Sequence, residues 1–121
     1  MPRKVSLMSA GFWAGQADAA VGTVQVGALA GSTQTDATAM TTSNVISTSG
    51  SGGMRLPPNP SPGDRVHYVN VSGNTASIYP ATGGTINALS ANAAISIATA
   101  KSCIFLAQSG TQWRTVPLVP S

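Results

Sequence analysis

Short apolar runs separated by turn residues fill the C-terminal two thirds of the chain. Alternation of apolar and polar positions predicts strands at residues 65–71, 76–79 and 94–98. Residues 101–107 are apolar on both faces, which predicts a central strand of a sheet. A register slip of one residue would exchange the buried and exposed faces of a strand. The expected core consists of Val66, Tyr68 or Val69, Ile78, Ile95, Ile97, Ile104, Leu106 and Trp113.

Turn residues between these runs indicate how the strands connect. The sequence Ser-Gly-Asn at 72–74 separates two predicted strands, which reads as a β-hairpin. Residues 57–64 contain four prolines, which fix φ and lack an N–H donor. This segment is therefore predicted to be a rigid surface loop. We expect an all-β fold, a small antiparallel sandwich or barrel formed by residues 44–121.

Residues 1–43 differ in composition from the rest of the chain and are expected to form a partly extended N-terminal arm. They are rich in Ala, Gly, Thr and Gln and hold few large apolar side chains. Alternation at residues 24–26 indicates one strand in this region. The aromatic pair Phe12 and Trp13 would reduce solubility if it were left exposed. It packs either on its own domain or into a neighbouring subunit, where a buried Trp contributes much of the binding energy.

Ionised side chains are scarce along the whole chain. Only 7% of the residues are charged, no Glu is present, and the net charge is +3, against about 25% charged residues in average soluble domains. Such a surface is expected to lie against other chains. The basic residues are scattered, so no direct nucleic-acid binding is expected. No apolar run approaches the length of a membrane span, and Gly11 and Gly15 interrupt any signal-peptide core, so we expect no membrane contact and synthesis in the cytoplasm without secretion.

Residues capable of catalysis or metal binding are few and dispersed. Cys103, the single cysteine, lies within an apolar run and is interpreted as a small buried hydrophobic residue. His67, the single histidine, lies in mid-strand and is interpreted as structural. Three Asp residues are widely spaced, so no carboxylate pair or metal cluster is indicated. We therefore expect no catalytic residues, no metal, no cofactor and no enzymatic activity.

From about residue 44 the chain resembles a β-module found among small virion proteins of tailed phages. The resemblance rests on residues 53–57 (GMRLP), 63–66 (GDRV), 76–89, 102–105 (SCIF) and 111–113 (TQW). Its most specific part is Tyr79-Pro80, then Gly83 and Ile86-Asn87, followed by an apolar strand and a closing Gln112-Trp113. Such modules are similar to capsid decoration (cement) proteins and to parts of tail fibres.

The resemblance implies a structural protein on the capsid surface of a virion. Its expected partners are the major capsid protein and further copies of itself, as a homotrimer. The alternative is a tail fibre or tail-associated module that binds host-surface glycans, for which Tyr79 and Trp113 are the only aromatic candidates in this region. A small-molecule binding domain would instead require a pocket. The expected interface residues are Arg3, Lys4, Phe12, Trp13, Arg55, Pro58 and Pro60.

Overall fold

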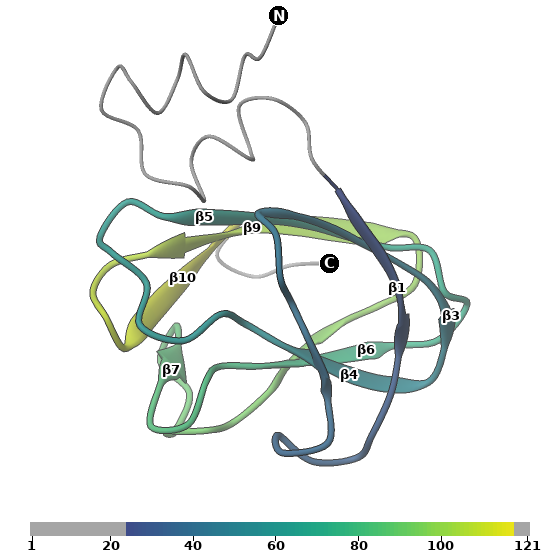
Figure 1. Ribbon diagram of the computed structural model, residues 1–121, viewed down its shortest axis with the longest axis horizontal. Coiled ribbons are helices and arrows are strands. Elements are labelled where there is room, and N and C mark those ends of the chain that lie inside the picture. The colour runs from purple at the N-terminus through teal and green to yellow at the C-terminus, as the bar shows by residue number, and fades with distance from the viewer. Residues whose placement is uncertain (1–23, 118–121) are drawn as a thin grey trace, which may run out of the picture.

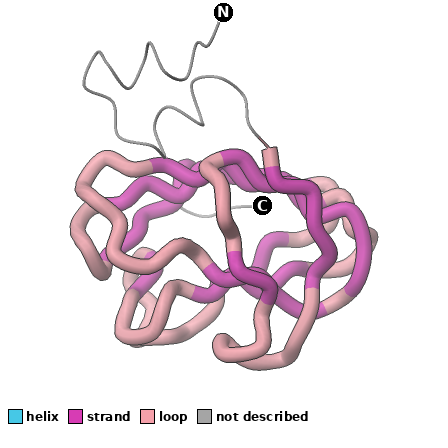
Figure 2. The backbone as a smooth tube through the Cα atoms, in the orientation of Figure 1, coloured by secondary structure: helices cyan, strands magenta, loops and turns pink. Residues whose placement is uncertain are grey.

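The computed structural model describes residues 24–117, and all regular structure in this range is β-strand (Figures 1 and 2). The all-β prediction is therefore confirmed. No helix in this range is long and apolar enough to cross a membrane. The strands are β1 (Gln25–Leu29), β2 (Thr38–Ala39), β3 (Asn44–Gly50), β4 (Gly52–Arg55), β5 (Arg65–Asn70), β6 (Ala76–Tyr79), β7 (Thr85–Ile86), β8 (Ile95–Ile97), β9 (Lys101–Ala107) and β10 (Gln112–Val116).

The strands form two sheets with the core between them. The six-stranded sheet has the order β1-β3-β5-β9-β10-β7, and the four-stranded sheet has the order β2-β4-β6-β8. In Figure 1, β5 and β9 lie across the top of the molecule and β4 and β6 lie across its lower part. From β1 to β6 the chain therefore alternates between the two sheets, placing one strand in each per circuit.

This alternation makes the fold a β-solenoid, and the prediction of an antiparallel sandwich or barrel is wrong. Each circuit returns to a sheet in the same direction, so β1, β3 and β5 pair in parallel, as do β2, β4 and β6. Antiparallel pairing occurs where β9 joins β5 and β10 and where β8 joins β6. The predicted hairpin is also wrong, because β5 and β6 belong to different sheets.

Strand register decides which apolar residues enter the core. On β5, Val66 and Tyr68 are buried while Val69 is 37% exposed. On β9, Cys103, Phe105 and Ala107 point inward, so the prediction of Ile104 and Leu106 as core residues is wrong by one position. Ile95 is half-buried and packs against the core. The remaining predicted core residues, Ile78, Ile97 and Trp113, are buried as expected.

The sheets begin before residue 44. The strand indicated at residues 24–26 is confirmed as part of β1, which pairs with β3. β2 likewise precedes residue 44 and pairs with β4. Residues 25–43 thus supply strands to the same two sheets as the rest of the chain. The expected arm contacts Arg3, Lys4, Phe12 and Trp13 lie outside the described residues.

Candidate functional site

The proline-rich segment at residues 57–64 is fixed at both ends by backbone hydrogen bonds. The N–H of Leu56 donates to the carbonyl of Tyr79 on β6 at 2.8 Å. At the other end, the N–H of Gly63 donates to the carbonyl of Ala107 at 2.9 Å, and the N–H of Ala107 donates to the carbonyl of Asp64 at 2.8 Å. Since the prolines also restrict φ, the loop is held in one shape between the two sheets.

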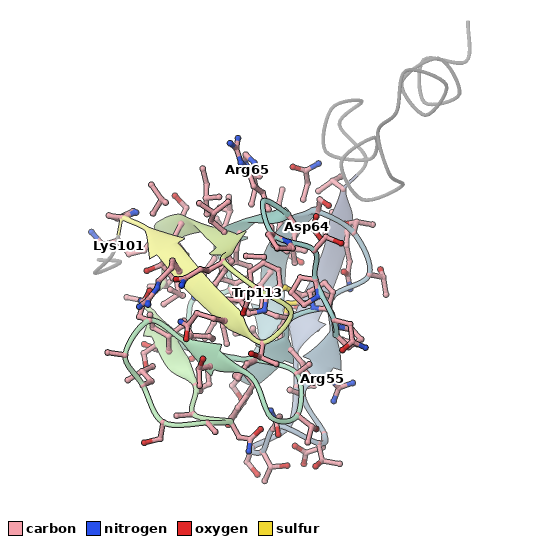
Figure 3. All side chains as sticks on the ribbon, turned by 90° about the vertical axis from the view of Figure 1, so that its left-hand side faces the viewer. Arg55, Asp64, Arg65, Lys101 and Trp113 are labelled. Atoms are coloured by element: carbon pink, nitrogen blue, oxygen red, sulfur yellow. The ribbon has the colours of Figure 1, made fainter. Side chains whose placement is uncertain are left out.

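A cleft of about 410 Å³ opens beside this loop, here called the proline-loop cleft. A smaller hollow of about 100 Å³ shares the loop and Trp113 with it and reaches Asp64 and Arg65. Figure 3 views this side of the molecule, with Trp113 near the centre and Arg55 and Asp64 to its right. The larger cleft is lined by Gln34, Thr35, Ala39, Met40, Arg55, Leu56, Pro57, Pro58, Asn59, Pro60, Ala81, Thr82, Gly84, Gly110, Thr111 and Trp113.

Arg55 places a positive charge on the wall of the cleft. It ends β4, and its Nη1 donates hydrogen bonds to the carbonyls of Gln34 at 2.9 Å and Thr35 at 3.1 Å. These two bonds orient the guanidinium but do not neutralise it, and no carboxylate within residues 24–117 pairs with it. An Arg held in this way is suited to a carboxylate or phosphate from a partner.

Three of the residues expected at an interface thus meet in one place. Arg55, Pro58 and Pro60 all line the proline-loop cleft, although their contact with a partner stays a prediction. Sequence reasoning missed the other walls, which come from loops far apart in the chain. No motif marks these residues, because only the stacking of successive circuits brings them together: Gln34 and Thr35, Ala81 and Thr82, and Gly110 and Thr111.

Arg55 is the only ionised side chain among the described residues that line the larger cleft. Among the described residues that line the larger cleft, none is a carboxylate, histidine or cysteine that could transfer a proton. Within residues 24–117, no group of three His, Cys, Asp or Glu side chains could hold a metal ion. Cys103 is buried away from the cleft, and burial raises the pKa of its thiol to about 12. The interpretation of Cys103 as a small buried residue is confirmed.

The two acidic side chains in the described range stabilise turns. Hydrogen bonds from the side chain and backbone of Thr33 lower the pKa of Asp36 in an exposed turn. Asp64 is buried at the end of the proline loop, where its Oδ2 accepts a hydrogen bond from the N–H of Ser61 at 2.8 Å. Each carboxylate therefore stabilises the conformation of its own loop, and the two loops are different ones.

Comparisons with protein-family models, with curated proteins and with solved structures find no match for this chain. The most specific part of the resemblance does have a structural explanation. Ile86 on β7 lies opposite Trp113 on β10, and both are buried. The side chain of Asn87 donates to Thr115 Oγ1 at 2.9 Å and accepts from the Thr115 N–H at 3.0 Å. The Ile86-Asn87 and Gln112-Trp113 pairs therefore join β7 to β10.

Proposed function

We propose that this protein is a structural virion protein without enzymatic activity. In this proposal it is a capsid decoration (cement) protein that binds the outer surface of a shell built from a major capsid protein. The observation that carries the proposal is the proline-loop cleft, a preformed surface that offers Arg55 beside the proline loop and has no carboxylate, histidine or cysteine among its described lining residues. Such a surface is suited to holding another chain.

The rigidity of the loop favours tight docking. Binding orders few additional torsions when the contact surface is already fixed, so less entropy is lost on association. A shell repeats its binding sites, and a decoration protein that forms a trimer would engage several of them at once. Linked binding events then raise the effective concentration and strengthen weak individual contacts. The trimer and the capsid-surface location belong to the same proposal.

The tail-module alternative lacks a comparable observation. Glycan stacking needs an aromatic ring with an accessible face, and Trp113 is only 2% exposed. Tyr79 is half-buried, and its hydroxyl donates to the carbonyl of Ser32 at 3.2 Å. Trp113 is therefore used in core packing, and Tyr79 is used in a hydrogen bond within the fold.

Sedimentation of the chain with purified, expanded shells of the virus that encodes it tests the proposal. The wild type is expected to bind saturably. Arg55→Ala is expected to weaken binding about tenfold, the effect of losing about 1.4 kcal/mol at an interface. Lys101→Ala is the matched control, since Lys101 is an exposed cation that does not line the cleft. Absence of saturable binding by the wild type, or binding to host cells instead of shells, would contradict the proposal.

A further inference from the structure

The outward side of the six-stranded sheet carries a second surface, which adjoins the smaller hollow beside the proline loop at Arg65. On β5 the residues alternate strictly, so that Val66, Tyr68 and Asn70 are buried while Arg65, His67 and Val69 are exposed. Figure 3 shows Arg65 projecting away from the body of the molecule. The neighbouring strands extend this surface, here called the outer face. It comprises Val26, Ile46, Arg65, His67, Val69, Ile104, Leu106, Arg114 and Val116.

Strand register arranges the outer face in three rows. In the first row, Leu106 on β9 lies opposite Arg65 on β5 and Arg114 on β10. Neighbouring strands are about 4.8 Å apart, so the two arginines leave the sheet about 10 Å apart with Leu106 between them. The second row holds His67, Ile104 and Val116, together with Asn44, which pairs with His67. The third row holds Val26, Ile46 and Val69, together with Ser102, which pairs with Val69.

The apolar part of this face is substantially open to solvent. Val26 is 61% exposed and Val116 is 51% exposed, and Ile46, Ile104 and Leu106 are half-buried. These residues are adjacent across strands rather than scattered singly. A contiguous apolar patch bordered by polar groups is the mark of a contact surface.

Every ionised side chain on the strands of this sheet is basic. Among β1, β3, β5, β7, β9 and β10, the charged residues are Arg65, Lys101 and Arg114. Asp36 and Asp64, the acids of the described range, lie in turns where the backbone N–H groups of Thr33 and Ser61 donate to them. The outer face thus offers positive charge at one end of an apolar patch.

This charge pattern selects one occupant over two others. A second copy docked through the same patch would offer no carboxylate to Arg65 or Arg114, because none stands on the strands of this sheet. Residues 1–23 carry Arg3 and Lys4 against the single acid Asp18, so they supply a net positive charge. Of these three occupants, an acidic partner is the one whose charge complements that of the outer face.

We propose that the outer face docks a protein surface that is apolar at its centre and carries carboxylates opposite Arg65 and Arg114. This inference goes beyond the proposed function and does not depend on it, because it concerns a different surface and states only the chemistry of the partner. The same chemistry would serve an acidic capsid protein or any other acidic subunit.

Amide chemical shifts of the ¹⁵N-labelled full chain provide the test, with a random copolymer of Glu and Tyr as the acidic, apolar probe. Titration is expected to give saturable shifts at β5, β9 and β10 that weaken as salt is added. The double variant Arg65→Glu, Arg114→Glu is expected to weaken binding at least about tenfold. Lys101→Glu, a charge reversal on the same sheet but outside the outer face, is the control and is expected to change binding less than about twofold. Polyglutamate, which lacks the apolar component, is expected to bind more weakly than the copolymer.

Four results would each overturn the inference. The first is that copolymer shifts fall at the proline-loop cleft or are absent. The second is that double-stranded DNA of equal charge binds the outer face as tightly as the copolymer, which indicates a nucleic-acid partner. The third is that outer-face shifts change on dilution of the free protein, which indicates a second copy. The fourth is that the double variant Phe12→Ala, Trp13→Ala perturbs the same amides without any probe, which indicates that residues 1–23 cover the face.

Discussion

The side-chain amide of Asn70 donates a hydrogen bond of 2.9 Å to the backbone carbonyl of Ile97. This bond links the end of β5 in the six-stranded sheet to the end of β8 in the four-stranded sheet. The same amide nitrogen donates to the carbonyl of Asn74 at 2.8 Å, and Oδ1 accepts from the Ser72 N–H and hydroxyl. Asn70 is fully buried, so its whole hydrogen-bonding capacity holds the turn that carries the chain between sheets.

Asn70→Ala is therefore expected to lower the free energy of unfolding by about 2 kcal/mol or more, because four hydrogen bonds are lost and the buried one to the Ile97 carbonyl is not replaced by water. Urea denaturation followed by circular dichroism measures the change. Asn74→Ala is the control, since it removes one exposed hydrogen bond to the carbonyl of Gly50 and is expected to cost less than about 1 kcal/mol. Equal losses in the two variants would show that Asn70 does not act as the link between the sheets.

Gly53 lies where β4 passes closest to β6. A Cβ at this buried position would overlap the carbonyl oxygen of Ser77 and lie 2.9 Å from Tyr79 Cε2. Gly53→Ala is therefore expected to destabilise the protein by about 2 kcal/mol or more, through strain between paired strands. At Gly27 in β1 the nearest atoms would be 3.9 Å from a Cβ, and Gly27→Ala is expected to stay within about 0.5 kcal/mol of the wild type. Thermal unfolding of the two variants tests this difference, and a neutral Gly53→Ala would contradict the β4–β6 packing.

Burial of Cys103 makes stability depend on alkaline pH. The pKa of the folded thiol is raised from its ordinary value of 9.0 to about 12. Between these values the unfolded chain releases a proton that the folded chain keeps, so the free energy of unfolding falls as pH rises. The limiting slope is about 1.4 kcal/mol per pH unit. Burial also raises the pKa of Tyr68 above 10.0, which adds a loss of the same sign at higher pH.

Cys103→Ala is accordingly expected to delay the alkaline loss of stability until Tyr68 begins to ionise in the unfolded chain, near its ordinary pKa of 10.0. Urea denaturation at half-unit steps from pH 7.5 to pH 10.5 measures the onset in both proteins. Identical pH profiles for the wild type and the variant would show that the thiol is not protected. An independent readout is the reaction of Cys103 with a thiol reagent near pH 8, which is expected to be slow in the folded protein and fast in urea.

The sequence predicted strands well but could not predict their partners. Alternation with period two placed Val66 in the core correctly but left Tyr68 and Val69 as alternatives, and the structure buries Tyr68 while Val69 is 37% exposed. On β9 both faces are apolar, so the pattern did not distinguish Phe105 from Leu106. The contact between Tyr68 and Phe105, with ring centroids 6.5 Å apart, shows which face packs inward. Parallel pairing joins strands that are a full circuit apart in the sequence. The turn residues between strands do not indicate which strands will pair.

The candidate site was predicted in the same partial way. Proline spacing correctly indicated a surface loop at residues 57–64, and Arg55, Pro58 and Pro60 do line one cleft. The loops opposite them have no shared pattern, so the cleft itself could not be predicted. The outer face left a readable signal in the alternation of Arg65, His67 and Val69 along β5. The sequence did not show that Leu106 and Arg114 lie beside Arg65, because that depends on the register between β5, β9 and β10.

We propose that the protein strengthens a shell by binding to it, and calorimetry of shells tests this claim most directly. Expanded shells are heated alone, with saturating wild-type protein, and with Arg55→Ala at the same concentration. The wild type is expected to raise the disruption temperature, because a ligand that binds only the intact state stabilises it by an amount that grows with the ratio of free ligand concentration to Kd. Arg55→Ala is expected to give a smaller rise at the same concentration. An unchanged disruption temperature at saturating wild-type protein would contradict the claim.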